Sequence, residues 1–392
     1  MKDDQIASTS GMPLEGLTVI DLTTWLGGYA GRILSDLGAD VVHVVAPDGV
    51  NGRRDHDVER MFSNFGKIEM SRGAGEAICL ADVEDLLEEA SILITDINPA
   101  NLNRYQLHPD ETTRRWPALI HVAITPYGLD GPQANFPATD LTLLADGGLL
   151  YLSGDSDRAP VRPAADQTTV VTSLHATVAT LMAVTALDHD GLGQIVDVSA
   201  QEAVAHSLEN AVQYFDCETF IRRRKGAGPA EAGVGLFSCI DGYVYILTTM
   251  GGASLGWEAT VQWLIDEQTS GAEKLREPQW QDSSFRRSPE AMTYFRTVFE
   301  DFSGSRTKET IYSNAQARGI SVAPVSEPTD LLHSGQLASR SFFHHVNIGG
   351  KEIQFPGLPY RFLNSTVGRF ETPESHASFG NPEPISATRV GS

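Results

Sequence analysis

The sequence predicts an α/β protein with a large domain built on a parallel sheet and a smaller second domain. Its first half repeats an order of apolar run, helical spacing and apolar run: LTVIDL at 17–22, the helical pattern of 29–37 and VVHVV at 41–45. Strands buried on both faces of a parallel sheet read as continuous apolar runs of this kind. The texture then changes at 216–232, a stretch rich in Gly, Pro and Ala that is typical of a linker or an exposed loop.

The same alternation continues along the chain and extends the parallel sheet. Gly38 ends the first helix because glycine accepts the positive φ of a helix C-terminus, and Pro47 ends the second strand. The elements expected next are a helix at 82–90, strands at 91–96 and 118–124, a long helix of small uncharged residues at 168–187, a strand at 193–199 and an amphipathic helix at 202–215. The long helix is expected to be buried by its neighbours.

The second half has a different organisation. Two strands around an Asp-Gly turn are expected within 235–249, and residues 257–320 are mostly helical and more polar. From 321 onward the regular pattern is lost and prolines become frequent. The boundaries expected from these changes are 1–215 for the large domain, 216–232 for the linker, 233–325 for the small domain and 326–392 for the final segment.

The charge balance excludes several classes of ligand. The chain has 29 Lys and Arg against 51 Asp and Glu, a net charge of -22. So acidic a protein lacks the basic face that nucleic acid or an anionic membrane requires, but a small anionic ligand responds to the local field of its pocket. We expect no membrane span, because no run of about 18 apolar residues is found. We expect a cytoplasmic location, because three scattered cysteines form no disulfide framework.

Motifs for common cofactors are weak. Gly27-Gly28 follows a strand and precedes a helix, where backbone amides favour an anion, but the sequence there is not G-x-G-x-x-G. Neither a G-x-S-x-G elbow nor a P-loop is found. The eleven histidines are dispersed, so no metal site is expected. The RRRK run at 222–225 fits either the phosphates of a nucleotide tail or a solvated charged loop.

Asp166 is the residue whose local sequence raises a catalytic question. It lies in PAADQTT, at the entrance to the long uncharged helix. An aspartate at a helix start commonly acts as an N-cap that accepts amide hydrogen bonds. A carboxylate in this place, next to small residues, is also suited to be a covalent nucleophile if a substrate reaches it. The local sequence leaves both roles open.

Several stretches, in the right order, resemble the class III CoA-transferases, the superfamily of formyl-CoA transferase, carnitine CoA-transferase and α-methylacyl-CoA racemase. The opening PLEGLTVIDLTTWLGGYAGRILSDLGADVV at 13–42 is similar to the family's P-L-x-G-x-x-V-x-D-x-T, Gly-rich turn and L-x-D-L-G-A-D-V. The other similar stretches are NFGK at 64–67, Pro99 with Arg104, ITPYGLDGP at 124–132, GQIVDVSAQEA at 193–203 and ARGISVAPVSEPTDLLHSGQLASRSFF at 317–343. The resemblance spans about residues 13 to 380.

The resemblance implies a fold and an assembly. It implies a Rossmann-like large domain built from both ends of the chain, so that 326–392 returns to complete it, and a smaller α+β domain inserted between. It also implies two chains interlocked like rings. The expected oligomer is a homodimer or a heteromer with a related CoA-transferase subunit.

The resemblance further implies that Asp166 is the nucleophile. Its carboxylate attacks the thioester of an acyl-CoA donor such as succinyl-CoA, which gives a mixed anhydride and then an aspartyl-CoA thioester that the acceptor acid attacks. CoA thioesters are therefore substrates, and no permanently bound cofactor is expected. Backbone amides of small residues stabilise the oxyanions. The residues expected to line the substrate site are Tyr127, Thr139, Gly251 and Gly252.

The expected CoA site departs from the family pattern. The family's Lys-x-Glu is His43-Val44-Val45 here, and its E-N-F is Thr95-Asp96-Ile97. Either CoA is held by other residues, or the chain binds it poorly and is a supporting, non-catalytic subunit of a heteromeric transferase. If the chain itself holds the polyanionic CoA, its basic residues must be concentrated along one channel. The residues expected to hold CoA are Gly27, Gly28, Arg53, Arg54, Lys67, Arg72 and Arg104.

Two further questions concern the reaction and the acceptor. The racemase branch places a His where this chain has Ala138, and without it proton transfer at the α-carbon by two bases loses one partner. An acyl-CoA racemase or isomerase is therefore a lesser alternative to CoA transfer. Several aromatic residues near the matched site suit an apolar or aromatic acid, although core packing explains them equally well: Trp25, Tyr29, Phe136 and Tyr151.

Overall fold

The chain divides into two compact units, each discontinuous in sequence. The computed structural model describes residues 11–46, 58–73, 77–224, 226, 231–250, 253–348, 351–363 and 367–368. Unit 1 comprises Met1–Leu152, Arg162–Arg222 and Gly335–Ser392, and unit 2 comprises Ser153–Val161 and Arg223–Ser334. Unit 2 thus contains the whole of the expected small domain, 233–325. It extends further, to residue 334, and takes in 153–161, which the sequence analysis placed in the large domain.

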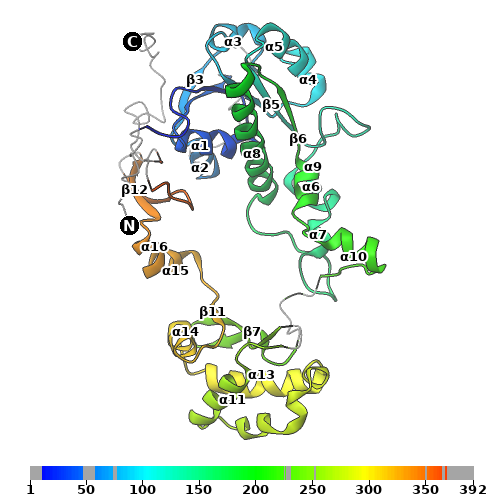
Figure 1. Ribbon diagram of the computed structural model, residues 1–392, viewed down its shortest axis with the longest axis vertical. Helices are drawn as coiled ribbons and strands as arrows, with labels where there is room; N and C mark the ends of the chain where they lie inside the picture. The colour runs from blue at the N-terminus through cyan, green and yellow to red at the C-terminus, as the bar shows by residue number, and fades with distance from the viewer. Residues whose placement is uncertain are drawn as a thin grey trace, which may run out of the picture. The chain divides into compact units, whose positions relative to one another are not determined.

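Unit 1 is built on a parallel sheet that has six strands among the described residues (Figure 1). In spatial order the strands are β3 (Ile68–Ser71), β2 (Asp40–Val45), β1 (Thr18–Asp21), β4 (Ile92–Thr95), β5 (Ile120–Thr125) and β6 (Ile195–Ser199). In this order, 3-2-1-4-5-6, the direction of progression through the sheet reverses between β1 and β4. The predicted α/β class with a parallel sheet is confirmed.

Helices cover both faces of this sheet. The helices of unit 1 are α1 (Gly28–Asp36), α2 (Val58–Asn64), α3 (Leu80–Leu87), α4 (Pro99–Arg104), α5 (Pro109–Arg115), α6 (Asp140–Asp146), α7 (Leu149–Leu152), α8 (Gln167–Asp190), α9 (Ala200–His206), α10 (Ala211–Glu218) and α16 (Gly335–Ser339). Helices α1 and α8 pack against each other over one core, while α3, α4 and α5, near the top of Figure 1, pack over another.

Successive residues of the central strands belong to opposite cores. Val19 of β1 and Val41 of β2 lie in the core beneath α1 and α8. Their neighbours on the other face differ in burial: Ile20 lies in the core beneath α3, and Val42 packs partly buried against that core. Side chains of a strand alternate between faces, so a strand covered on both sides must be apolar at every position. This requirement explains the continuous apolar runs in the sequence.

Helix α8 differs from the sequence expectation in two ways. By length and composition it is a candidate for crossing a membrane, although Thr, Ser and His residues interrupt its apolar sequence, and the sequence analysis did not single it out as one. In the fold it packs against α1, α9, β5 and β6. It is also not buried on all sides, because only a face of small residues is covered, which lets its backbone approach its neighbours closely. Its other face exposes larger apolar side chains, Val170, Leu174, Val178 and Met182.

The helix expected at 202–215 is two helices in the structure. Helix α9 ends at His206 and α10 begins at Ala211. Between them Glu209 has a φ of 60°, a left-handed conformation that cannot continue a helix. Helix α10 then runs to Glu218, so the first residues of the expected linker at 216–232 are helical. Residues 225 and 227–230 of that segment lie outside the described part of the chain.

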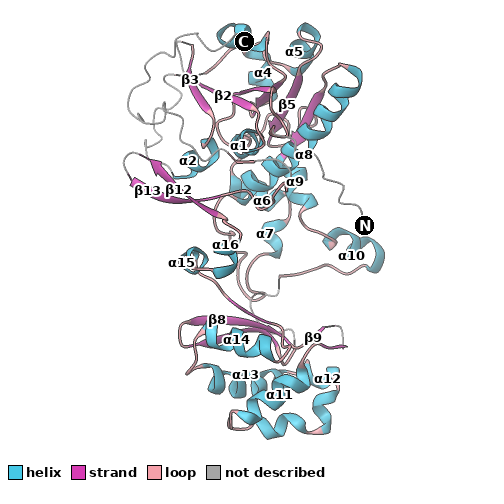
Figure 2. Ribbon diagram, turned by 60° about the vertical axis from the view of Figure 1, so that its left-hand side comes forward, coloured by secondary structure: helices cyan, strands magenta, loops and turns pink. Residues whose placement is uncertain are grey.

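A C-terminal hairpin belongs to unit 1. Strands β12 (Phe343–Ile348) and β13 (Lys351–Pro356) pair antiparallel and pack beside α2 (Figure 2). Arg32 of α1 ties this segment down: its Nη2 donates to the Pro356 carbonyl at 3.0 Å, and its guanidinium lies 4.7 Å from the Phe355 ring centroid. A cation above aromatic faces is attracted by their quadrupole. The final segment therefore packs on the domain that the first residues build.

Unit 2 is an α+β unit with its own core. Its antiparallel sheet has the order β11-β8-β7, and the turn between β7 and β8 consists of Ile240 and Asp241, so Gly242 begins a strand instead of lying within the turn. Three tryptophans are almost fully buried beneath its helices. Its elements are β7 (Val234–Cys239), β8 (Gly242–Leu247), β9 (Thr249–Met250), β10 (Ala253–Ser254), α11 (Trp257–Asp266), η1 (Ala272–Arg276), η2 (Pro278–Gln281), α12 (Ser283–Arg286), α13 (Pro289–Ser303), α14 (Lys308–Ala317), β11 (Val322–Pro324) and α15 (Pro328–Leu332).

Candidate active site

A cleft of about 930 Å³ lies at the carboxyl ends of the parallel strands of unit 1. In doubly wound sheets ligands bind outside the carboxyl ends of the strands, where the strand order reverses. Here β1 and β4 flank that point. The cleft is lined by residues 22–25 after β1, 43–46 at the end of β2, 96–98 after β4 and Pro126 after β5.

Asp166 lines this cleft from the start of α8. It occupies the N-cap position, yet its side chain accepts no hydrogen bond from the amides of its helix. The N-cap role that the sequence left open is therefore not the one observed. The preceding Ala165 has a φ of 61°, which is costly for a residue with a Cβ. Such strain is found where a functional side chain has to be aimed.

The Asp166 carboxylate contacts an arginine that the sequence analysis missed. Nη2 of Arg162 lies 2.5 Å from Oδ1 of Asp166 and 3.0 Å from Oδ2 of Asp140. Asp140 is the first residue of α6 and is buried. The available signal was the spacing of four residues between Arg162 and Asp166, but in an irregular segment that spacing does not predict a contact.

A second carboxylate, that of Asp96, is bound by the backbone amides of the loop after β1, which could otherwise bind an anionic ligand. Its two oxygens accept hydrogen bonds from the backbone N–H groups of Thr24, Trp25 and Leu26, at 2.6–2.9 Å. Burial raises the pKa of Asp96, although these amides act in the opposite direction. Amides after the first strand are where doubly wound folds bind phosphate. In this chain an internal anion already fills that place.

Lys67 lies beneath the cleft and does not line it. Its ammonium is 1% exposed and donates to Oδ2 of Asp21 at 2.7 Å, the Gly28 carbonyl at 2.7 Å and Oδ1 of Asn64 at 2.9 Å. An ammonium has three protons, and these acceptors use all of them. Lys67 therefore holds the start of α1 in place, and the structure does not present it to a phosphate.

Arg72 and Arg104, the other described basic residues expected at the CoA site, are not among the residues that line the cleft. Arg72 pairs with Asp85 at 3.0 Å, and Arg104 is exposed beside Tyr105. Arg53 and Arg54 lie outside the described residues, in the sequence between Ala46 and Val58, which both line the cleft. Arg60 is the one arginine among the described residues that line the cleft, and its guanidinium pairs with Glu69 at 2.7 Å.

The RRRK run has structural contacts in its described part. Arg222 lies 4.4 Å from the Tyr214 ring centroid. Arg224 donates to the carbonyls of Asp155, at 2.8 Å, and Arg158. Lys225 lies outside the described residues. Arg222 and Arg224 therefore make contacts within their own units. The sequence analysis expected either a phosphate site or a solvated loop here, and neither alternative included such contacts.

The residues expected to line the substrate site are distributed unevenly. Thr139 is the N-cap of α6 and accepts the Thr142 amide, while its neighbour Ala138 lines the cleft. Tyr127 packs partly buried on the core beneath α1 and α8, and Pro126 beside it lines the cleft. Gly251 and Gly252 lie outside the described residues.

The glycine pair at the start of α1 has two separate roles. A Cβ on Gly27 would approach Thr23 Cγ2 to 2.6 Å and Ile124 Cδ1 to 2.7 Å, so this close packing requires glycine. Gly28 lines the cleft and its carbonyl accepts from Lys67. Of the site residues expected from the sequence, the structure thus brings Gly28 and Asp166 to one cleft among the described residues.

Aromatic side chains line the same cleft. Trp25 and Tyr29 do so while packing against the core, as Tyr105 does on the other face. Phe136 also lines the cleft and is 54% exposed, so core packing does not account for it. Tyr151, which the sequence analysis grouped with these residues, lies on α7 and is not among the lining residues.

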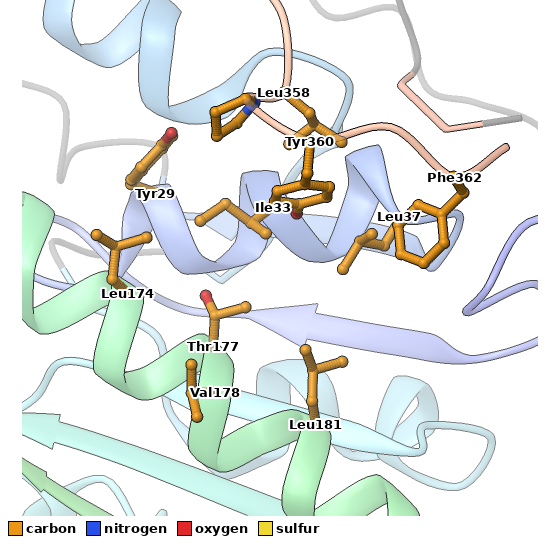
Figure 3. Close-up of a pocket in the computed structure, with 11 residues that line it drawn as sticks. Tyr29, Ile33, Leu37, Leu174, Thr177, Val178, Leu181, Leu358, Tyr360 and Phe362 are labelled. Atoms are coloured by element: carbon orange, nitrogen blue, oxygen red, sulfur yellow. The ribbon is translucent and has the colours of Figure 1, made fainter.

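A separate cavity of about 360 Å³ is almost wholly apolar (Figure 3). Ile33 and Leu37 of α1 face Leu174 and Leu181 of α8 across it, and Tyr360 of the C-terminal segment covers it. Within the part of the chain that the structure describes, its lining contains no carboxylate, histidine, lysine or arginine. The described residues also contain no group of three or more His, Cys, Asp or Glu arranged to hold a metal ion. Of the two cavities, the cleft that contains Asp166 is therefore the one whose described lining has titratable side chains.

A doubly wound sheet with a carboxylate-bearing cleft at its switch point is the arrangement of an α/β enzyme that acts on a small molecule. Residues 14–375 match CoA-transferase family III, and the chain belongs to this family. The chain is 33% identical over 378 residues to the succinyl-CoA:(R)-benzylsuccinate CoA-transferase subunit BbsE of Thauera aromatica, covering 92% of this chain and 91% of that one. It is a CoA-transferase by family, as the sequence resemblance implied.

Other relatives and solved structures agree with this assignment. The chain is 25% identical to the succinyl-CoA–L-malate CoA-transferase alpha subunit of Chloroflexus aurantiacus, over 91% of this chain and 84% of that one. It is 24% identical to the succinyl-CoA:mesaconate CoA-transferase of Haloarcula hispanica, over 90% of each chain. The crystal structure of a CAIB/BAIF family protein from Brucella suis has the same fold, with a TM-score of 0.80 at 23% identity over 94% of this chain and 97% of that one.

Proposed function

We propose that this chain transfers CoA between succinyl-CoA and a carboxylic acid, with the Asp166 carboxylate as covalent carrier. The observation that carries the proposal is the position of Asp166: it lines the cleft at the switch point, and its carboxylate does not cap its own helix. Succinyl-CoA is proposed as donor because the three relatives above are all named for it. Ala165, the residue before Asp166, has a strained positive φ, which supports a role for the backbone in directing the Asp166 side chain into the cleft.

The proposed reaction needs neither a metal ion nor a redox cofactor. An Asp166 oxygen lone pair forms a bond to the acyl carbon of the donor, and the C–S electron pair leaves on sulfur as CoA thiolate. The thiolate attacks the aspartyl carbon of this anhydride, which releases succinate and leaves an aspartyl-CoA thioester. The acceptor carboxylate displaces the thiolate to form a second anhydride. The thiolate then attacks the acceptor's acyl carbon and regenerates the Asp166 carboxylate.

The acceptor is proposed to be an apolar or aromatic acid. Phe136 exposes its ring on the same cleft as Asp166 without a core to explain it, and Trp25 and Tyr29 line that cleft as well. Aromatic faces of this kind contribute dispersion and stacking to a ring-bearing ligand. We further propose that the enzyme is cytoplasmic and that it uses CoA thioesters as substrates. We propose that it assembles as an interlocked homodimer or as a heteromer.

A second candidate is a supporting subunit of a heteromeric transferase. It is favoured by the charge of the described cleft, where Asp96 fills the amides suited to phosphate and Arg60 is already paired with Glu69. CoA carries several phosphate charges, so a partner would have to supply the cations. Two of the relatives are themselves named as subunits.

The test is exchange by the purified chain, alone and together with a co-expressed related subunit. Succinyl-CoA is incubated with a panel of aliphatic and aromatic acids, and new CoA esters are identified by mass spectrometry. Asp166→Ala is compared with Asp188→Ala, an exposed aspartate at the far end of α8. We expect exchange that Asp166→Ala abolishes and Asp188→Ala retains. Exchange that needs the related subunit and survives Asp166→Ala would instead support the second candidate.

A further inference from the structure

Arg162 is held by one carboxylate and reaches a second. Its Nε and Nη2 atoms both lie 3.0 Å from Oδ2 of Asp140, and Nη2 also lies 2.5 Å from Oδ1 of Asp166. The guanidinium is planar, so two contacts on one carboxylate fix the direction in which the fork points. The hydrogen bond to Asp140 is the main cause that raises the pKa of Arg162, and Asp166 adds to it. Asp140 thus fixes the Arg162 guanidinium in place (the anchor), and the guanidinium in turn contacts Asp166.

The anchor itself is rigid. Asp140 is only 6% exposed, and its Oδ1 accepts the backbone N–H of Thr168 at 3.1 Å. The Thr168 hydroxyl donates back to the Asp140 carbonyl at 3.3 Å. These two bonds join the first residue of α6 to the first turn of α8, directly beside Asp166. A shift of Asp140 therefore requires a shift of two helix starts.

The arrangement leaves the two Asp166 oxygens in different states. Oδ1 is engaged by Arg162, whereas Oδ2 has no hydrogen-bond partner within the described part of the chain. Ala165, with its positive φ, fixes the backbone just before. A carboxylate held by one oxygen and open at the other is restricted in rotation, which brings a nucleophile closer to a reactive geometry.

We propose that Arg162 is a positioning residue of the transfer reaction: anchored on Asp140, it holds Oδ1 of Asp166 and leaves Oδ2 to form the bond to the acyl carbon. This inference rests on the proposed function, in which Asp166 is the covalent carrier. Nothing in the sequence resemblance assigned a role to Arg162.

The charges of the three groups suit both halves of a reversible exchange. With Asp166 ionised, the two carboxylates and the guanidinium sum to a charge of about -1. When Oδ2 bonds to an acyl carbon, Asp166 loses its charge, and Asp140 with Arg162 remain as a neutral pair, so no uncompensated cation is left in the cleft. In the last step the thiolate attacks the acceptor's acyl carbon, and the electron pair of the bond between that carbon and the anhydride oxygen returns to the Asp166 carboxyl next to Arg162, which stabilises the departing carboxylate.

The experiment replaces Arg162 in the active transferase that contains this chain. Arg162→Gln is expected to lower kcat about 10- to 100-fold while KM for the acyl-CoA changes less than about threefold, because the group acts on the reacting carboxylate. Arg162→Lys is expected to restore part of kcat. Added guanidinium ion is expected to accelerate Arg162→Ala and not the parent enzyme. Arg158→Gln is the matched control, since Arg158 is exposed and pairs only loosely with Asp155, at 3.9 Å.

Three results would overturn the inference. The first is an unchanged kcat in Arg162→Gln. The second is a loss of kcat that neither lysine nor guanidinium restores and that follows a fall in thermal stability, which indicates a structural role. The third is an equal effect in Arg158→Gln. Failure of the proposed function looks different, because exchange then survives in Asp166→Ala. Loss of activity in Asp166→Ala with normal kinetics in Arg162→Gln removes only the role of Arg162.

Discussion

The Asp21 carboxylate and the Lys67 ammonium lie 2.7 Å apart, both almost completely withdrawn from solvent. Burial by itself would raise the pKa of Asp21, but Lys67, His43 and Thr23 together hold it below its ordinary value. Burial also lowers the pKa of Lys67, opposed by Asp21. The pair supports the loop after β1 and the start of α1, which form one wall of the cleft.

This pair predicts that Lys67→Met destabilises the protein and does not simply weaken CoA binding. Removing one member of a buried ion pair leaves an uncompensated charge and costs about 3–5 kcal/mol. Asp21→Asn combined with Lys67→Met is expected to recover a large part of that loss. Urea unfolding of the single and double variants measures both effects, with Lys351→Met, on the exposed side of β13, as control. A stable Lys67→Met with only a raised KM would return Lys67 to the CoA site.

The internal anion Asp96 predicts a gain of ligand affinity on substitution. Asp96→Asn keeps an oxygen that can accept the amides of Thr24 and Trp25 but removes a negative charge from the cleft. We expect the affinity for free CoA to rise about three- to tenfold, because a phosphate-bearing ligand no longer faces that carboxylate. Isothermal titration calorimetry measures the change. Asp85→Asn, which removes an exposed carboxylate paired with Arg72, is the control and should leave affinity unchanged.

The buried His121 predicts a loss of stability in acid. Burial lowers its pKa to about 3 from 6.5, and its ring nitrogens contact the hydroxyls of Thr95 and Thr112. Because the folded-state pKa is depressed, the unfolded chain binds the proton more readily, and stability present above pH 6.5 is lost as the pH falls toward 3. Between pH 7.5 and 4.5 this group contributes a loss of about 2.5 kcal/mol.

The check for His121 is a comparison of variants at two pH values. Urea unfolding at pH 7.5 and 4.5 is expected to show a smaller pH dependence in His121→Gln than in the parent protein. His189→Gln, at the exposed end of α8, should behave as the parent does. An identical pH dependence in all three proteins would show that His121 is not kept neutral by the fold.

Much of the fold could be predicted because its signals are local. The apolar runs LTVIDL and VVHVV predicted strands buried on both faces, and the structure has strands there with both faces of the sheet covered. Strand β3, Ile68–Ser71, was not predicted, because its sequence has no continuous apolar run. It is an edge strand whose residues alternate between partial and full exposure. The break at Glu209 was missed because a single left-handed residue leaves the apolar spacing almost unchanged.

The site could be predicted only in part, because its contacts are not local. Asp166 was found through its place before a long helix and through family resemblance, and the structure puts it in the cleft. Lys67 looked like a phosphate ligand because the sequence does not show that Asp21, 46 residues away, lies against it. Arg162 was overlooked because its orientation depends on Asp140, which is distant in sequence and buried by tertiary packing.

The covalent carrier can be observed directly. The purified transferase is incubated with succinyl-CoA without an acceptor, quenched in hydroxylamine and digested, and the peptide that contains Asp166 is sequenced by mass spectrometry. Hydroxylamine converts an aspartyl-CoA thioester at Asp166 to a hydroxamate at that residue, so we expect this modification in the parent protein and its absence when succinyl-CoA is omitted. Active exchange with Asp166 unmodified, or with the hydroxamate on another carboxylate, would show that Asp166 is not the carrier.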